Sequence, residues 1–305
     1  MKRLAFGFLL SVIILFHAST IKAQSAIPRA ELITRMTNAY PALSPSGLRM
    51  AYMSNADGDF DIYVLHLSER VLIKLTDAAD RDGTPVWSPD GSRIAFQSFR
   101  EGHSQIYIMG ADGRNQVNIS NSESHDEHPF WSADGKRILF CSDRTRTKGK
   151  EDNNIDIFEM NADGSHVRQI TKTPEVETYA SWSPDGKKIV CRKILKNGDW
   201  EIVVMNSDGS NPENISNQDG IDGWPVWSPD GKSIAYASEY GDHTRIFAVN
   251  ADGTNKTRIS DDAPLDDRQP WWHPDGSLLL FSRYQWFQGQ PWYEASEIYI
   301  ASIKD

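Results

Sequence analysis

The sequence predicts an all-β fold, a six-bladed β-propeller built from four-stranded antiparallel blades. One phrase, TPVWSPDGSRIAF at 84–96, returns four times in recognisable form and once, at 40–52, in a degenerate form. Aligned on the tryptophan or its equivalent, successive copies lie 44, 44, 51, 45 and 45 residues apart. A period near 45 residues with several short β-rich runs is typical of propeller blades. A β-solenoid is the alternative, but its repeats are usually shorter.

Each repeat contains four short runs that favour strands, separated by turn signals. The first run ends at the tryptophan, and a Pro-Asp-Gly turn follows, because Pro presets φ and Gly accepts a positive φ. The second run comes directly after the turn, the third carries Ile-Tyr-x-Met or a variant before another Asp-Gly, and the fourth is a short closing phrase such as VNIS. The predicted repeats are 38–76, 77–120, 121–171, 172–216, 217–260 and 261–305.

The last repeat has no closing phrase of its own. The chain ends at EIYIASIKD (297–305), which is a third run, whereas ELITRMT (31–37) is similar to a closing phrase with no repeat before it. We expect 31–37 to complete the last blade as a clasp that joins the two ends of the chain and removes an exposed sheet edge.

The first 23 residues have the layout of a secretory signal peptide. Lys2 and Arg3 precede an apolar run at 4–16 that is too short to span a bilayer, and a more polar stretch ends at Ala23. We therefore expect an exported protein, periplasmic or secreted and not membrane-spanning, whose propeller occupies 24–305.

Charge and cysteine content exclude two classes of protein. The chain carries a formal net charge of −10. Such an acidic surface repels phosphate backbones, which excludes nucleic acid as an expected partner. Cys141 and Cys191 are the only cysteines, so the chain is no disulfide scaffold, and two buried free thiols are the expected arrangement.

Together these motifs resemble the TolB-type β-propeller repeat family. The resemblance rests on the Trp-Ser-Pro-Asp-Gly turn, the aliphatic-aromatic run after it, and Ile-Tyr-x-Met followed by Asp-Gly, and it covers 31–305. It implies a propeller of the cell envelope that binds other proteins. Similar repeats occur in propeller domains of peptidases and in some polysaccharide lyases, one family of which holds a metal with histidines from several blades. The sequence departs from the TolB pattern in one respect, because TolB carries an α/β domain before its propeller.

An acidic residue stands five positions before the tryptophan in five repeats. One interpretation is that each caps backbone amides of the connection between blades in an Asx-type turn. The other is a ring of carboxylates around the channel mouth, able to hold a divalent cation or a basic peptide. The residues are Asp82, Asp126, Glu177, Asp222 and Asp267, and we expect Arg81, Tyr179, Trp224 and Arg268 in the same segments to take part in binding.

Two further segments on the same face carry candidate binding residues. His125 and His128, with acidic neighbours in SHDEHP, are a candidate site for a transition metal, although the spacing matches no established metal motif and mixed charge is common in surface loops. Trp286, Phe287 and Trp292 suit stacking on a sugar or anchoring an interface. The alternative is that this aromatic loop covers an edge of its own blade.

The sequence favours a non-catalytic protein-binding scaffold, expected to be a monomer that requires no cofactor. We expect its partner to be a protein of the periplasm or envelope. Binding is expected on the loop face, which contains the connections between blades and the loops between second and third strands, because variable loops on a rigid scaffold usually carry binding. The alternative is a carbohydrate-binding or polysaccharide-degrading propeller, a lyase or hydrolase, with a divalent cation in the loop face.

Overall fold

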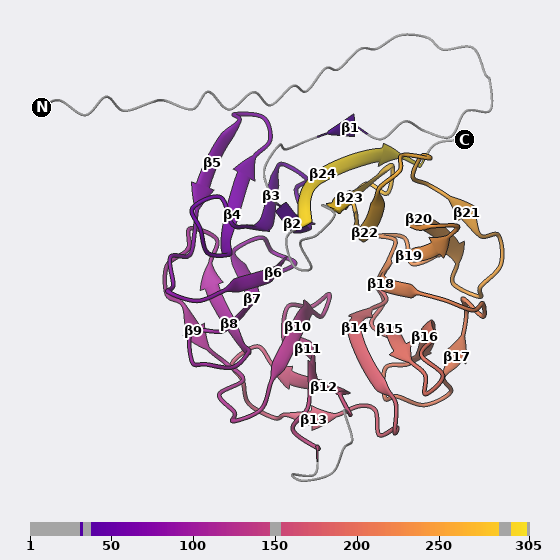
Figure 1. The fold of residues 1–305 in the computed structure, drawn as a ribbon. Coiled ribbons are helices and arrows are strands. Elements are labelled where there is room, and N and C mark those ends of the chain that lie inside the picture. The colour runs from indigo at the N-terminus through magenta and orange to yellow at the C-terminus, as the bar shows by residue number, and fades with distance from the viewer. Residues whose placement is uncertain (1–30, 33–37, 147–153, 287–293, 304–305) are drawn as a thin grey trace, which may run out of the picture.

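The computed structural model describes residues 31–32, 38–146, 154–286 and 294–303. These residues form six four-stranded sheets, which stand as blades around a central axis (Figure 1) and confirm the predicted fold class. The first strand of each blade lies nearest the axis, and in blades 1 to 5 the next three strands follow outward in sequence order.

The strands have the following bounds. Blade 1 contains β2 (Asn38–Leu43), β3 (Arg49–Ser54), β4 (Asp61–His66) and β5 (Val71–Lys74). Blade 2 contains β6 (Asp82–Trp87), β7 (Arg93–Ser98), β8 (Gln105–Gly110) and β9 (Val117–Asn118). Blade 3 contains β10 (Asp126–Trp131), β11 (Arg137–Ser142), β12 (Asp156–Asn161) and β13 (Arg168–Gln169). Blade 4 contains β14 (Val176–Trp182), β15 (Lys188–Ile194), β16 (Trp200–Asn206) and β17 (Glu213–Asn214). Blade 5 contains β18 (Asp222–Trp227), β19 (Ser233–Tyr240), β20 (His243–Asn250) and β21 (Thr257–Arg258). Blade 6 contains β22 (Asp266–Trp272), β23 (Leu278–Trp286), β24 (Glu294–Ser302) and β1 (Glu31–Leu32).

The repeated Ser-Pro-Asp-Gly turn is held by side-chain hydrogen bonds, as blade 2 shows. Ser88 Oγ donates to Asp90 Oδ1 at 2.6 Å, and the backbone N–H of Ser92 donates to the same oxygen at 3.0 Å. Gly91 has a φ of +68°, in the left-handed region that side chains rarely adopt. The hydrogen bonds, that from Ser88 first, lower the pKa of Asp90 to about 2. This part of the repeat therefore specifies a turn.

The tryptophan at the end of the first strand joins neighbouring blades. Trp87 Nε1 donates to a backbone carbonyl oxygen of blade 1 at 3.2 Å. Equivalent bonds of 3.2 Å join blade 3 to blade 2 through Trp131 and blade 6 to blade 5 through Trp272. The Nε1 atoms of Trp182 and Trp227 are buried and have no hydrogen-bond partner among the described residues. The two sides of blade 4 therefore lack this bond.

The hydrophobic core lies in the layers between successive blades. Ala51 and Ile62 of blade 1, for example, pack in one cluster with Ile94 of blade 2. Cys191 is fully buried, as is Cys141, and both are free thiols, as the sequence predicts. In the other five blades the position of Cys191 holds an aromatic side chain that is at most 1% exposed, namely Tyr52, Phe96, Phe140, Tyr236 and Phe281.

The two ends of the chain meet in blade 6. β1 pairs antiparallel with β24, with Glu31 opposite Ile300 and Leu32 opposite Tyr299. The predicted clasp is therefore formed by its first two residues. Its remainder, 33–37, and the predicted signal segment, 1–23, lie outside the described residues. Within the described ranges, no helix has the length and apolar character needed to cross a membrane.

Candidate functional site

Every first strand contains a β-bulge at the equivalent place. In blade 2 the register between β6 and β7 shifts between Gly83 and Val86. The residue that begins the bulge has a φ between 47° and 56° in all six blades, although it is never glycine. Proline, which has no N–H to give to the ladder and is therefore suited to bulges, follows it in five of the six blades. The six bulge residues are Tyr40, Thr84, His128, Tyr179, Trp224 and Gln269.

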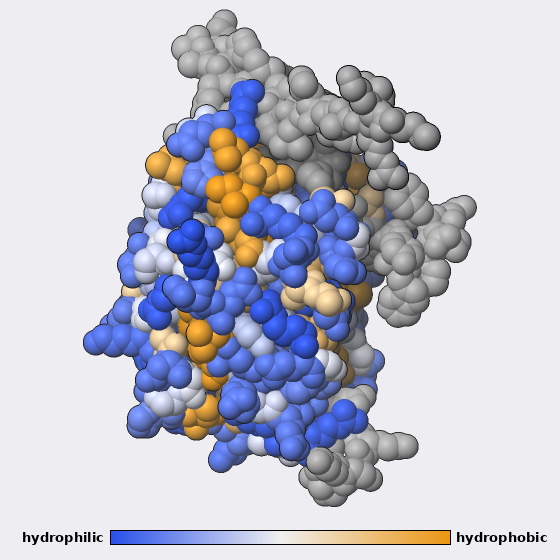
Figure 2. All heavy atoms as spheres, turned by 90° about the vertical axis from the view of Figure 1, so that its left-hand side faces the viewer, coloured by the Kyte–Doolittle hydropathy of each residue, from blue (hydrophilic) through white to orange (hydrophobic). Residues whose placement is uncertain are grey.

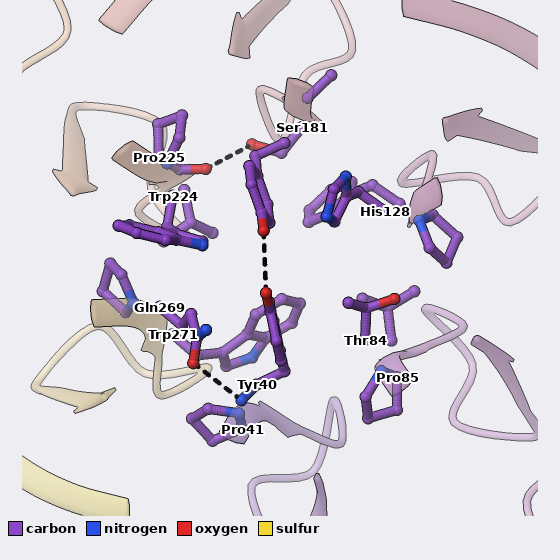
Figure 3. A pocket seen from close by; sticks show the side chains of 17 residues that line it. Tyr40, Pro41, Thr84, Pro85, His128, Ser181, Trp224, Pro225, Gln269 and Trp271 are labelled. Atoms are coloured by element: carbon purple, nitrogen blue, oxygen red, sulfur yellow. Dashed lines mark hydrogen bonds between the residues drawn. The ribbon is translucent and has the colours of Figure 1, made fainter. Parts of the chain in front are cut away.

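These bulge residues surround a cavity on the propeller axis. A bulge re-aims one side chain relative to the normal alternation of a strand, and here all six residues line the same space (Figure 3). The cavity has a volume of about 90 Å³. A left-handed non-glycine residue costs of order 1 kcal/mol or more, and every blade contains one at this place.

Two of the bulge residues meet across the axis. Tyr40 of blade 1 and Tyr179 of blade 4 point toward each other, and their hydroxyl oxygens are 2.9 Å apart (Figure 3). The ring centroids are 6.4 Å apart and the ring planes differ by 10°. Burial, followed by the neighbouring Tyr40, raises the pKa of Tyr179 well above the ordinary value. The Tyr179 phenol is therefore a neutral hydrogen-bonding group.

Blade 4 and its neighbours form an aromatic wall of this cavity. The ring centroid of Tyr179 lies 3.7 Å from that of His128 and 5.7 Å from that of Trp224. Behind them, the guanidinium carbon of Arg192 lies 4.6 Å from the Tyr179 ring centroid and 4.3 Å from that of Trp200. Burial, and then the charge of Arg192, lower the pKa of His128 to about 3. His128 is therefore a neutral imidazole at physiological pH.

A larger pocket of about 310 Å³ opens on the loop face between blades 1, 2, 3 and 6. It shares Tyr40, Thr84 and His128 with the central cavity, so the two spaces adjoin one another. Met53 contributes to its apolar lining, and a Cβ atom at Gly83 would lie 2.7 Å from Met53 Sδ. The guanidinium carbon of Arg81 lies 4.5 Å from the ring centroid of Phe99, and both residues line the pocket. We call this pocket the mouth.

The opposite face has a separate opening of about 230 Å³. It is lined by the tryptophans and prolines of the Ser-Pro-Asp-Gly turns, among them Trp131, Pro184 and Pro229. Phe130 and Trp271 line both this opening and the central cavity. The structure thus places the turns on one face and Arg81, Phe99 and their connections on the other.

The five predicted carboxylates do not form an open ring at the channel. Each is at most 2% exposed, because each blade supplies its own cation or polar partner. Arg100 Nη2 lies 2.9 Å from Asp82 Oδ2, and burial raises the pKa of Asp82 while Ser98 and Arg100 oppose this effect. Similar pairs join Asp126 to Arg144, Glu177 to Lys193 and Asp267 to Arg283, and Asp222 accepts from Gln218. The repeated acidic position therefore holds buried, paired carboxylates, and a binding role for them stays a prediction.

The other predicted binding residues lie in several different places. Tyr179 and Trp224 line the central cavity, and Arg81 lines the mouth. The guanidinium carbon of Arg268 lies 5.5 Å from the Trp224 ring centroid, which places it beside the aromatic wall. Trp286 is the last residue of β23, while Phe287 and Trp292 lie outside the described residues.

The two candidate metal ligands have different surroundings. His128 lines the central cavity and stacks on Tyr179. His125 is exposed, with its Nδ1 atom 3.1 Å from Ser104 Oγ. In the part of the chain that the structure describes, no group of three or more His, Cys, Asp or Glu side chains is placed to hold a metal ion. The proposed site at His125 and His128 rests on two imidazoles that do not face one space, and it stays a prediction.

Sequence reasoning missed the bulge ring as a set. Tyr40, Thr84 and Gln269 were not predicted as site residues, and neither was Arg192. The signal that identifies the ring is the residue three positions before each tryptophan, which varies from blade to blade while proline follows it in five of them. A variable residue at a fixed place in a repeat indicates a position that the fold leaves open to function.

Comparison with known proteins agrees with this fold. The family described as the TolB beta propeller domain matches residues 19–151 and 190–290. None of the curated proteins is a match for the sequence.

Three solved structures illustrate the similarity. TolB from Acinetobacter baumannii superposes with a TM-score of 0.65 at 22% identity over 79% of this chain and 58% of that one, so the chain spans less than two thirds of that relative. A putative TolB from Agrobacterium tumefaciens gives a TM-score of 0.66 at 22% identity, over 90% of this chain and 92% of that one. Oligogalacturonate lyase from Vibrio parahaemolyticus gives 0.57 at 15% identity, over 88% and 91%. Identities this low show a shared fold alone.

Proposed function

The chain belongs to the TolB β-propeller domain family, and from this membership we propose that it is a non-catalytic scaffold that binds a protein partner of the cell envelope. The partner segment enters at the mouth on the loop face and reaches toward the central cavity. The protein acts as an exported, periplasmic or secreted component.

The single observation that carries this proposal is the chemistry of the mouth. Its volume of about 310 Å³ is at the lower end of the range of established ligand sites. Met53, Phe60 and Phe99 give it an apolar lining, and Arg81 stands over Phe99 at 4.5 Å. Arg81 forms no ion pair with any residue that the structure describes. Arginine is, with tryptophan and tyrosine, enriched among the residues that dominate protein–protein binding energy.

The position of the mouth next to the central cavity favours an extended segment as the bound element. The two spaces share Tyr40, Thr84 and His128, so an occupant of the mouth contacts the bulge ring. The ring residues all belong to hydrogen-bonded strands, and a preorganised site loses less entropy on binding.

The test is capture of envelope proteins by the purified full chain. We expect Arg81→Glu to lower the recovery of the captured partner at least tenfold. We expect Phe99→Ala to lower this recovery more than any single substitution on the turn face does. The matched control is Lys136→Glu, a charge reversal at an exposed residue of a Ser-Ala-Asp-Gly turn on the opposite face. Equal recovery with wild type, Arg81→Glu and Lys136→Glu would rule out the mouth as the binding site.

The rival proposal, a carbohydrate-active propeller, draws on the aromatic wall. Tyr179, Trp200 and Trp224 offer ring faces of the kind on which sugars stack. Incubation with a panel of polysaccharides, together with measurement of bound divalent metal, separates the two proposals. Shortened oligosaccharides that depend on a bound metal would replace the scaffold proposal with this one.

A further inference from the structure

The seam between blades 3 and 4 contains four buried side-chain oxygens that have no hydrogen-bond partner in the part of the chain that the structure describes. They are Asn154 Oδ1, Asp156 Oδ1, Thr173 Oγ1 and Glu177 Oε2. Buried polar atoms without a partner are rare, because each loses its hydration without compensation. The equivalent positions between blades 1 and 2 and between blades 4 and 5 contain one such oxygen each, on Asp82 and on Asp222. The accumulation of four therefore distinguishes this seam.

Backbone and side-chain contacts bring three of these residues together. The N–H of Glu177, near the start of β14, donates to the carbonyl oxygen of Ile155 at 2.8 Å, which places β14 beside the start of β12 in the neighbouring blade (Figure 1). Asn154 Nδ2 donates to Asp156 Oδ2 at 3.1 Å. Because the amide nitrogen is committed to this bond, the amide oxygen of Asn154 is available to another group. Asp156 is fully buried and Glu177 is 2% exposed.

The preceding seam, between blades 2 and 3, shows where the fourth residue lies. The two seams can be aligned on a hydrogen bond that both contain, from an isoleucine N–H in the third strand to a hydroxyl fourteen positions later. This bond runs from Ile106 to Ser120 at 2.9 Å in blade 2 and from Ile157 to Thr171 at 3.0 Å in blade 3. In the order given above, the equivalents of the four residues are His103, Gln105, Ser122 and Asp126.

Ser122 contacts all three of its companions. Its carbonyl oxygen lies 2.8 Å from His103 Nε2, its N–H donates to Gln105 Oε1 at 2.9 Å, and its hydroxyl donates to Asp126 Oδ2 at 2.8 Å. Thr173 occupies the place of Ser122 in the next seam. The repeat therefore positions Thr173 between the other three residues of its own cluster, which we call the seam cluster.

The seam cluster has an excess of negative charge. Asp156 Oδ2 accepts from the uncharged side chains of Thr145, Asn154 and Gln169 at 2.6 to 3.1 Å, and Asp156 forms no ion pair with any residue that the structure describes. Lys193 Nζ lies 3.3 Å from Glu177 Oε1 and 3.4 Å from Glu175 Oε2, so one ammonium group serves two carboxylates. Three carboxylates and one ammonium group leave a formal excess of two negative charges.

We propose that Asn154, Asp156, Thr173 and Glu177 form a calcium site. Calcium takes six to eight oxygen ligands in a flexible arrangement, drawn from carboxylates, amide carbonyls and water, whereas magnesium requires near-ideal octahedral geometry. The cluster offers oxygen atoms alone, which does not suit the metals that prefer imidazole or thiolate. Only two of its four side chains are carboxylates, so it is not one of the groups of three or more His, Cys, Asp or Glu, of which the described residues contain none placed for a metal.

A calcium ion at the seam cluster ties blade 3 to blade 4. Asn154 and Asp156 belong to blade 3, and Glu177 belongs to the first strand of blade 4. The indole Nε1 of Trp182, in the same first strand, has no hydrogen-bond partner among the described residues, so the bond that fastens other blades to the preceding one is missing here. The ion supplies a connection of a different kind at this seam.

The test is equilibrium dialysis of the full chain against calcium after treatment with EGTA, together with thermal unfolding in calcium and in magnesium. We expect one calcium ion per chain with saturable binding, a rise in Tm with calcium because the ion binds the folded state, and a smaller rise with magnesium. Asp156→Asn keeps the shape of the side chain and is expected to weaken calcium binding at least tenfold. The matched control is Asp61→Asn, because Asp61 holds the same repeat position in blade 1 but pairs with Lys74 at 3.0 Å. Its calcium affinity is expected to equal that of the wild type.

A second variant keeps the test decisive if Asp156→Asn does not fold. Thr173→Val replaces the hydroxyl by a methyl group of similar shape, and at least a threefold loss of calcium affinity is expected. Calcium affinity that is unchanged in Thr173→Val, or lowered equally in Asp156→Asn and Asp61→Asn, would overturn the site.

Weak binding of calcium to the molecular surface is distinguished by its stoichiometry. Figure 2 shows that hydrophilic side chains cover most of the outer surface on the side of blades 1 and 2, and the chain carries a formal net charge of −10. Such a surface attracts cations at many places, so binding without saturation and without a rise in Tm would identify surface binding only and contradict the site. Calcium binding is measured on the chain alone, so its outcome is independent of partner capture at the mouth.

Discussion

Tyr40 and Tyr179 approach from opposite blades and hydrogen-bond at 2.9 Å on the axis of the propeller. This hydrogen bond crosses the ring of six bulge residues and connects blade 1 to blade 4 through side chains alone. Tyr40 lines both the central cavity and the mouth, so the pair lies where these two spaces adjoin.

We expect the two tyrosines to stabilise the fold as one unit. Tyr40→Phe and Tyr179→Phe each remove one partner of the same hydrogen bond, and each is expected to lower the free energy of unfolding by about 1 kcal/mol. The double variant is expected to lose no more than the larger single loss, because the bond can be lost only once. Urea denaturation of the four proteins measures this coupling, and additive losses would contradict it.

The buried pair of Arg283 and Asp267 is expected to be a major contributor to stability. Arg283 is 5% exposed, and its Nε and Nη2 atoms lie 2.6 and 2.9 Å from the two Asp267 oxygens. Arg283→Met leaves the carboxylate buried without its partner, so we expect a loss of about 3–5 kcal/mol in the free energy of unfolding.

The control for this prediction is an exposed ion pair. Lys187 and Asp185 lie 3.5 Å apart with the Lys187 side chain 81% exposed, and Lys187→Met is expected to change the free energy of unfolding by less than about 0.5 kcal/mol. Similar losses in the two variants would show that burial does not set the strength of the Arg283–Asp267 pair.

His128 makes stability depend on pH. Its pKa is lowered to about 3 in the folded protein and is about 6.5 in an unfolded chain. Between these values the unfolded state binds a proton that the folded state does not, so the contribution of the neutral imidazole is present above pH 6.5 and is lost as the pH falls toward 3. Lowering the pH from 7.5 to 5 is expected to cost up to about 2 kcal/mol of stability through this group.

The comparison that isolates His128 is with His128→Gln, which cannot take up a proton. We expect the difference in the urea midpoint between the two proteins to shift in favour of His128→Gln as the pH is lowered from 7.5 to 5. An identical pH dependence in both proteins would show that the imidazole is protonated in the folded state.

The two cysteines are expected to be unreactive in the folded protein. Burial raises the pKa of Cys141 to about 12 and that of Cys191 well above its ordinary value, and the thiolate is the reactive form. A thiol reagent such as DTNB is expected to label neither cysteine under native conditions and both in guanidinium chloride. Rapid labelling of the native protein would contradict the burial of these thiols between blades.

The fold could be predicted because its determinants are local and repeated. Trp87 and the Asp90-Gly91 turn recur at nearly constant spacing, and each repeat encodes one blade without reference to the others. The clasp could be predicted for the same reason, since Glu31 and Leu32 begin a closing phrase whose blade is absent from the N-terminal side.

The site could be predicted only in part, because the bulge changes which side chains face the axis. Simple alternation along a strand does not reveal that Tyr179 and Trp224 face the cavity while Glu177 and Asp222 are buried beneath the surface. The partners of the acidic residues lie at more than one position of the repeat, since Arg100 and Arg144 occupy one position and Lys193 and Arg283 another, so no single position in the repeat identifies them. Arg192 was missed because a single arginine in a strand carries no signal until its neighbours are known.

The missing indole bonds on the two sides of blade 4 have a mechanical consequence. Trp87, Trp131 and Trp272 fasten their blades to the preceding ones, whereas Trp182 and Trp227 do not. The seams of blade 4 are therefore the most compliant among those that carry this tryptophan, and blade 4 also supplies Tyr179 and Arg192. We expect blade 4 to tilt outward more readily than the blades that this bond fastens to a neighbour.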